Sequence, residues 1–127
     1  MTYTFSVPGK PVAKQRARKG PYGFYTPNRT RNYETEAAWW AKRGGITEPK
    51  EGPVALLVRA YFPASKLHPE GYPHLTKPDA DNIQKIIADA LNGVAYFDDG
   101  QVYLSQCTKR YAREPRVEVD VLYGSID

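Results

Sequence analysis

The sequence predicts an α+β fold, a single domain with a small mixed β-sheet and packed helices in the order strand, loop, helix, strand, loop, helix, strand, strand. Two segments alternate apolar and polar side chains, as half-buried strands do, and two others have helical spacing. The absence of either common glycine-rich phosphate loop argues against a doubly wound fold and a nucleotide cofactor. With 127 residues, the chain is expected to form one domain, residues 1–127.

Four strands are expected. Thr2 to Val7 and Arg116 to Tyr123 each place every second side chain on an apolar face. Val54 to Phe62 is a continuous run rich in residues that favour strands. Val102 to Arg113 is predicted to be a strand that a turn through Pro115 links to the last strand as a hairpin.

The first helix is predicted from about Tyr33 to Arg43. Asn32 or Thr30 would cap it, and Glu34 and Glu36 would lie in its first turn, where acidic side chains suit the helix dipole. Two glycines follow and are expected to end the helix.

Charge is distributed unevenly along the chain. Residues 1–43 carry nine Lys or Arg against two Glu, whereas residues 44–127 carry nine against twelve acidic residues. Basic residues beside an acidic centre are what an enzyme acting on phosphodiesters needs, although a solvated basic surface would give the same balance. No signal peptide or membrane span is recognisable, so we expect a cytoplasmic protein without a membrane partner.

Residues 8–32 are predicted to form a basic arm or flap without regular structure. Basic residues alternate there with Tyr22, Phe24 and Tyr25, a mixture that can pair with phosphates and stack on bases. A merely disordered basic arm is the alternative. The candidate nucleic-acid-binding residues are Lys10, Lys14, Arg16, Arg18, Lys19, Arg29, Arg31 and Lys77.

The remaining singular residues have ordinary interpretations. The proline-rich loop before the second helix contains His68 and His74, which are expected to be surface histidines because no ligand lies at matching spacing. Cys107 is the single cysteine and is expected to be a buried or half-buried strand residue, since it has no partner for a disulfide or a zinc site.

Lys77 to Val102 contains five of the fourteen acidic residues, Asp79, Asp81, Asp89, Asp98 and Asp99. On a helical wheel, Asp81, Lys85 and Asp89 fall on one side and the isoleucines and Leu91 on the other. Carboxylates gathered in this way would repel one another unless a cation lies between them, and oxygen ligands favour Mg²⁺ or Mn²⁺.

Each part of this stretch also has a purely structural interpretation. Asp79 is a possible N-cap, and Asp81 with Lys85 a possible pair one helical turn apart. Asp98, Asp99 and Gly100 have the composition of a turn in which the glycine takes a positive φ.

The segment PDADNIQKIIADAL, followed by Phe97-Asp98-Asp99-Gly100-Gln101-Val102, resembles the RusA-type Holliday junction resolvases of phages and prophages, as do VPGKPVAKQRARKG and YTPNRTRNYE more weakly. The resemblance implies a homodimer that cuts four-way DNA symmetrically in recombination and repair. It implies that Asp79, Asp81 and Asp99 bind Mg²⁺, with Mn²⁺ as a substitute, and that Lys85 is catalytic. Residues 78–102 would be the metal-binding helix and turn, with Asp89 in support and the role of Asp98 open.

Two alternatives remain open at this point. The chain could be a non-catalytic nucleic-acid-binding module whose carboxylates only cap and pair. It could instead be a nuclease that acts on other branched DNA, with the same site residues.

Overall fold

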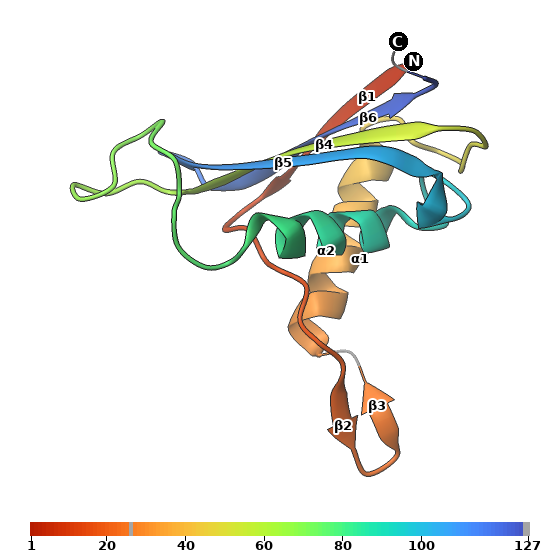
Figure 1. Cartoon of the computed structure of the whole chain (residues 1–127), viewed down its shortest axis with the longest axis horizontal. Helices are drawn as coiled ribbons and strands as arrows, with labels where there is room; N and C mark the ends of the chain where they lie inside the picture. The colour runs from red at the N-terminus through yellow and green to blue at the C-terminus, as the bar shows by residue number, and fades with distance from the viewer. Residues whose placement is uncertain (26, 126–127) are drawn as a thin grey trace.

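A computed structural model describes residues 1–25 and 27–125. Within them, both helices lie on the same side of a four-stranded sheet, and a small two-stranded hairpin projects beyond the helices, away from the sheet (Figure 1). The elements are β1 (Thr2–Pro8), β2 (Arg18–Gly20), β3 (Gly23–Tyr25), α1 (Asn28–Arg43), β4 (Val54–Pro63), α2 (Ala80–Leu91), the 3₁₀ turn η1 (Asp99–Gln101), β5 (Val102–Ala112) and β6 (Arg116–Tyr123).

The sheet is mixed, as predicted, with the strand order β1-β6-β4-β5. β6 pairs antiparallel with both β1 and β4, whereas β4 pairs parallel with β5. The predicted hairpin between β5 and β6 is therefore wrong, because β4 lies between them. Alternation along a strand does not reveal its neighbour, and the three residues 113–115 are long enough to cross the end of β4, a span of about 10 Å.

The core lies between the sheet and the two helices. The predicted apolar face of α2 is fully confirmed, since all five of its apolar positions are buried: Ile83, Ile86, Ile87, Ala90 and Leu91. These side chains pack against the alternate residues of β4 and β6 that face the helices, including Val58 and Val119. Burial of a complete helix face fixes the rotation of α2, and with it the direction of its polar side chains.

Helix α1 begins at Asn28, five residues earlier than predicted. Pro27 occupies the N-cap position with φ −55°, and no side chain caps the helix. Thr30 and Asn32 therefore lie inside the helix, and Glu34 and Glu36 lie beyond its first turn. Buried Thr30, in the first turn of the helix, forms hydrogen bonds with Gln15 of the arm, a tertiary contact that a capping pattern does not reveal.

Part of the basic arm is more regular than predicted. Residues 18–25 form the β2–β3 hairpin, whose three-residue strands are too short to show a period in the sequence. The final part of the predicted arm belongs to helix α1, so Arg29 and Arg31 are helical residues. Thr26 lies outside the described residues.

The surroundings of His74 also differ from the expectation. Its side chain is only 8% exposed and its ring stacks on Phe62 with a centroid distance of 3.7 Å. The loop folds back over the end of the sheet, so the histidine closes the core there. Burial first, then the positive charge of Lys109, lowers the pKa of His74. His68 is exposed, as predicted, and Cys107 is half-buried in β5, also as predicted.

The sheet face turned away from the helices carries an ionic network. The Arg59 guanidinium donates to both carboxylate oxygens of Asp120 at 2.9 and 3.1 Å, and to Glu118 at 3.0 Å. Thr4 donates to Asp120 at 2.8 Å, so strands β1, β6 and β4 are joined across this face. Among the described residues, no helix is long and apolar enough to cross a membrane.

Replacing Asp120 with Asn should lower the free energy of unfolding at neutral pH by about 1–2 kcal/mol. The hydrogen bond from Arg59 holds the pKa of Asp120 below its usual range, although partial burial opposes this shift. The stabilisation is therefore complete above the unfolded-state pKa and disappears as the pH falls through the lowered folded pKa. Urea denaturation at neutral and strongly acidic pH measures the difference. Glu51→Gln, at an exposed position, is the control, and an undiminished loss at acidic pH would contradict the ionic origin.

Candidate functional site

Two carboxylates, those of Asp79 and Asp81, belong to the beginning of helix α2. Asp79 occupies the N-cap position with extended backbone angles, yet its side chain makes no capping hydrogen bond. Its carboxylate instead accepts a hydrogen bond from the Lys77 ammonium at 2.9 Å. The hydrogen bond that Lys77 donates to Asp79 raises the pKa of Lys77, and the charge of Asp81 adds to this shift, so both carboxylates act on one ammonium group. The purely structural interpretation of Asp79 as a helix cap is therefore wrong.

Lys85 faces the arm rather than Asp81. Among the residues that the structure describes, Lys85 makes no ion pair, and it lines a hollow of about 280 Å³ together with Arg16 and Lys14. Asp81 instead accepts a hydrogen bond from the backbone N–H of Asn82 at 3.0 Å. The pairing of Asp81 with Lys85, considered from the sequence, is absent, and the Lys85 ammonium is left for another anion.

The arm lies along helix α2 and is fastened there by Lys14. The backbone N–H of Lys14 donates to the carbonyl of Asn82 at 3.0 Å. Its ammonium lies 2.9 Å from Glu34 of α1 and 3.0 Å from Asp89 of α2. Partial burial lowers the pKa of Lys14, but the hydrogen bonds that it donates to the two carboxylates outweigh this effect and raise the pKa overall. Asp89 thus supports the arm, with Lys14 rather than Lys85 as its partner.

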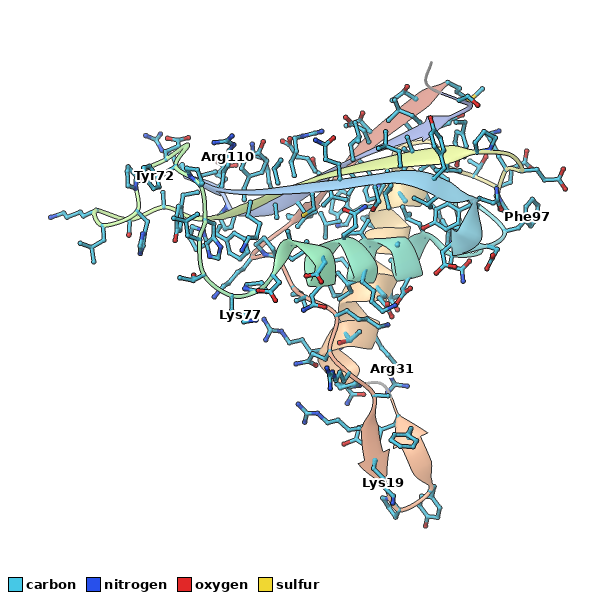
Figure 2. The ribbon with its side chains drawn as sticks, viewed as in Figure 1. Lys19, Arg31, Tyr72, Lys77, Phe97 and Arg110 are labelled. Atoms are coloured by element: carbon cyan, nitrogen blue, oxygen red, sulfur yellow. The ribbon has the colours of Figure 1, made fainter. Side chains whose placement is uncertain are left out.

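The other predicted basic residues divide between two places. Lys10, Arg29 and Lys77 line a second hollow of about 340 Å³, also bordered by Lys14, next to the beginning of α2. Arg18 and Lys19 lie in the hairpin, and Figure 2 shows Lys19 and Arg31 on the same side of the molecule as the arm. The basic groups therefore form a path from the hairpin to Asp79 and Asp81.

Asp98 and Asp99 have different surroundings. The Asp98 carboxylate accepts a hydrogen bond from the Gly100 N–H at 3.2 Å and caps the turn η1. Gly100 does not have the predicted positive φ. A Cβ at this position would lie 2.7 Å from the Asp98 carboxylate, so glycine is needed for space. Both side chains are exposed, but only that of Asp98 accepts a capping hydrogen bond.

Asp99 lies near the opposite end of α2 from Asp79. Tyr96 donates to the carbonyl of Ala88 at 2.6 Å, and burial, followed by the charges of Asp99 and Asp89, raises the pKa of Tyr96. Figure 2 shows Lys77 and Phe97 at opposite ends of the helix. Twelve residues of α-helix are about 18 Å long.

The structure brings together only part of the implied set of metal ligands. No group of three or more acidic, histidine or cysteine ligands comes together within residues 1–25 and 27–125. Mg²⁺ commonly uses only one or two protein carboxylates, with water and substrate phosphate as the other ligands. Asp79 and Asp81 satisfy that requirement, and Asp99 of the same chain does not join them.

Comparison with known proteins identifies the family of the chain. The family model of endodeoxyribonuclease RusA matches residues 8–122. The chain belongs to the RusA endodeoxyribonuclease family. YqaN of Bacillus subtilis (strain 168), an uncharacterized protein, is 33% identical over 135 residues, which cover 91% of this chain and 92% of YqaN. The resemblance inferred from residues 78–102 is confirmed, and the RusA family is one of endodeoxyribonucleases that resolve Holliday junctions.

Gln101 of this RusA-family chain is a site residue that the sequence analysis did not select. Its side-chain carbonyl accepts hydrogen bonds from the N–H groups of Phe97 and Asp98 at 2.9 and 3.1 Å. Its amide group donates to the carbonyls of Lys50 and Gly52, both at 2.9 Å. One side chain therefore fixes the Asp98–Asp99 turn to the loop before β4. The glutamine three residues after Asp98 was the available signal, because it completes a capping box.

Lys109 is a second such residue. From β5, its ammonium donates to the carbonyls of Thr76 and Pro78, each at 2.8 Å. These bonds hold the backbone immediately before Asp79. In the sequence Lys109 is an ordinary polar residue of a strand, so no local pattern indicates this contact.

Gln101→Leu should release the turn that carries Asp99. The variant loses four hydrogen bonds and keeps a side chain of similar size, so we expect the free energy of unfolding to fall by about 1–3 kcal/mol. Hydrogen exchange should accelerate at the amides of Phe97 and Asp98 and stay unchanged in the central strand β4. Gln106→Leu, at an exposed position of β5, is the matched control. Unchanged exchange at both amides would show that Gln101 does not hold the turn.

Proposed function

We propose that this RusA-family protein is a metal-dependent endodeoxyribonuclease that resolves four-way DNA junctions by paired, symmetric cleavage in recombination and repair. The observation that carries the proposal is the carboxylate pair at the beginning of α2. Asp79 occupies a capping position without capping, and Asp81 lies in the first turn of the same helix. A path of basic side chains leads to this pair, which is the charge arrangement that a nuclease needs.

Asp79 and Asp81 would hold Mg²⁺, or Mn²⁺ in its place, through their carboxylate oxygens. When bound there, the metal would activate a water molecule and offset negative charge on the phosphate. Lys85 is exposed one turn further along α2 and would stabilise negative charge that develops on the phosphate oxygens. Lys109 would keep Asp79 in place through its bonds to the preceding backbone.

Asp99 would complete the site of a second copy of the chain in a homodimer. Its separation from Asp79, by about the length of α2, excludes a shared ion within the chain as it is folded here. The Asp99 turn also exposes apolar surface, since Phe97 is 58% exposed and Leu104 is 38% exposed. Two chains packed with their α2 helices antiparallel, so that the Asp99 end of each lies against the Asp79 end of the other, would cover that surface and would give two equivalent sites, one for each of two opposed strands.

Asp81→Asn should reduce cleavage of a four-way junction by about a hundredfold or more, because a bound metal contributes several kcal/mol to the transition state. Binding of the junction should persist, since the basic path is unchanged. Gel assays with and without Mg²⁺, on four-way, three-way and linear DNA, measure both activities. Glu70→Gln, an exposed substitution in the loop before α2, is the charge-matched control. Retained cleavage by Asp81→Asn would contradict the proposed site.

Mixed dimers should show whether Asp99 acts across the interface. A heterodimer of Asp81→Asn and Asp99→Asn has one intact site if Asp99 comes from the partner, and none if it acts within its own chain. We therefore expect this heterodimer, isolated with two different tags, to nick one strand of a junction, although both variant homodimers are inactive. A heterodimer of wild type with Asp81→Asn nicks one strand in either case and is the control. No nicking by the first heterodimer would place Asp99 in its own chain's site.

A further inference from the structure

The β2–β3 hairpin displays three exposed aromatic side chains. Tyr22, at the tip, is 102% exposed, Phe24 is 76% exposed and Tyr25 is 51% exposed. The hairpin extends away from the sheet and beyond the end of α1 (Figure 1). Exposed aromatic surface on a projecting element is unfavourable in water unless a ligand covers it.

The turn holds Tyr22 at the outermost point. Gly20 and Gly23 are paired across the hairpin, and only Pro21 and Tyr22 connect them. Gly23 has φ +107°, a conformation that closes the turn and that other residues rarely adopt. Tyr22 therefore stands in a two-residue turn that is closed by a pair of glycines.

The two faces of the hairpin carry different rings. Tyr25 lies across from Arg18, and a Cβ on Gly20 would lie 3.2 Å from the Tyr25 ring, so that ring covers the glycine. Phe24 pairs with Lys19, and cross-strand partners share a face. Each face thus combines a ring with one basic side chain, which is the combination that stacks on a base and pairs with its phosphate.

The positive charge around the hairpin favours the binding of a polyanion. No acidic residue precedes Glu34 in the sequence, whereas seven Lys or Arg do. The hairpin continues directly into the arm at Arg16 and Lys14, which lies along α2. A ligand on the hairpin is therefore continuous with the proposed cleavage site.

We propose that the hairpin binds unpaired nucleobases at the branch point of the DNA, with Tyr22 and Phe24 stacking on bases and Arg18 and Lys19 pairing with the adjoining phosphates. The hairpin would keep the branch open and set the position of each strand relative to Asp79 and Asp81. This inference rests on the proposed function and goes beyond it, because it assigns the recognition of branched structure to residues outside the site.

The test compares Tyr22→Ala/Phe24→Ala with wild type on a junction that carries 2-aminopurine at the branch point. In EDTA, wild type should raise the fluorescence as the base leaves its neighbours, and the double variant should not. Its affinity should fall about tenfold for each lost stacking contact, with no change in salt dependence, since no charge is removed. Tyr22→Phe/Phe24→Tyr, which retains both rings, is the matched control and should behave as wild type.

Cleavage assays on two junctions distinguish an effect on the opening of the branch from an effect on catalysis. With Mg²⁺, the double variant should cut a fully paired junction at least about tenfold more slowly than wild type. A junction with unpaired bases already at the branch should be cut within about twofold of wild type, because opening is no longer required. Equal loss on both junctions would overturn the proposal, as would a wild-type fluorescence change in the double variant.

Two further measurements make the outcomes distinct. Arg18→Ala/Lys19→Ala should reduce the salt dependence of binding by about 0.9 in logarithmic slope for each lost phosphate contact, and an unchanged slope would overturn their role. The second measurement is of mass: light scattering should give the same mass for wild type and the double aromatic variant. A change of mass would make the hairpin a contact between copies and overturn the proposal. If wild type cuts no DNA, the proposed function fails, and the fluorescence in EDTA still decides whether the rings stack.

Discussion

The ion pairs of Lys14 hold together the three parts that meet at the candidate site. Its ammonium joins Glu34 of α1 to Asp89 of α2, and its backbone joins the arm to α2 at Asn82. The Lys14, Glu34 and Asp89 side chains are 20–24% exposed, so water screens them less than it screens surface pairs. Without Lys14, two carboxylates from neighbouring helices would face each other, a loss larger than that of an ordinary surface pair. The position of the basic arm thus depends on the packing of the helices.

Packing of helix α2 in the core fixes the direction of the polar side chains at the candidate site. Its apolar face is buried against the sheet, so a rotation by one residue, about 100°, would expose isoleucines as well as redirect Asp81 and Lys85. Both ends are also tied to distant parts of the chain. Lys109 of β5 holds the backbone before Asp79, and Gln101 holds the turn that carries Asp99 to the loop before β4. The carboxylates are therefore placed by contacts that stabilise the fold as a whole.

The sequence predicted the features that depend on short-range pattern. The strands β1, β4 and β6, the apolar face of α2 and the RusA family follow from periodicity and from one continuous motif. The pairing of β5 with β4 was not predictable, because strand order is decided by packing between segments far apart in sequence. The burial of His74 and the early start of α1 have the same origin, since each depends on a contact with another element.

At the candidate site, the sequence selected the carboxylates but not their geometry. Asp79, Asp81 and Asp99 lie in one motif, and a motif read along the chain suggests one site. Helix α2, about 18 Å long, lies between Asp79 and the turn that carries Asp99, so residues of one sequence motif are far apart in the structure. Likewise, Gln101 and Lys109 donate to backbone carbonyls. Every residue has such a carbonyl, so the sequence pattern did not identify their partners.

Because α2 is rigid, Asp99 cannot approach Asp79 of the same chain. A flexible linker would let Asp99 approach Asp79 within one chain, and the site would then need no partner. A helix with one fully buried face cannot bend by that amount without breaking the core. In the proposed dimer, the same helix would set the distance between two shared sites, each of which forms only when both chains are present. Cleavage by a single chain would thereby be prevented, which is what symmetric resolution of a junction requires.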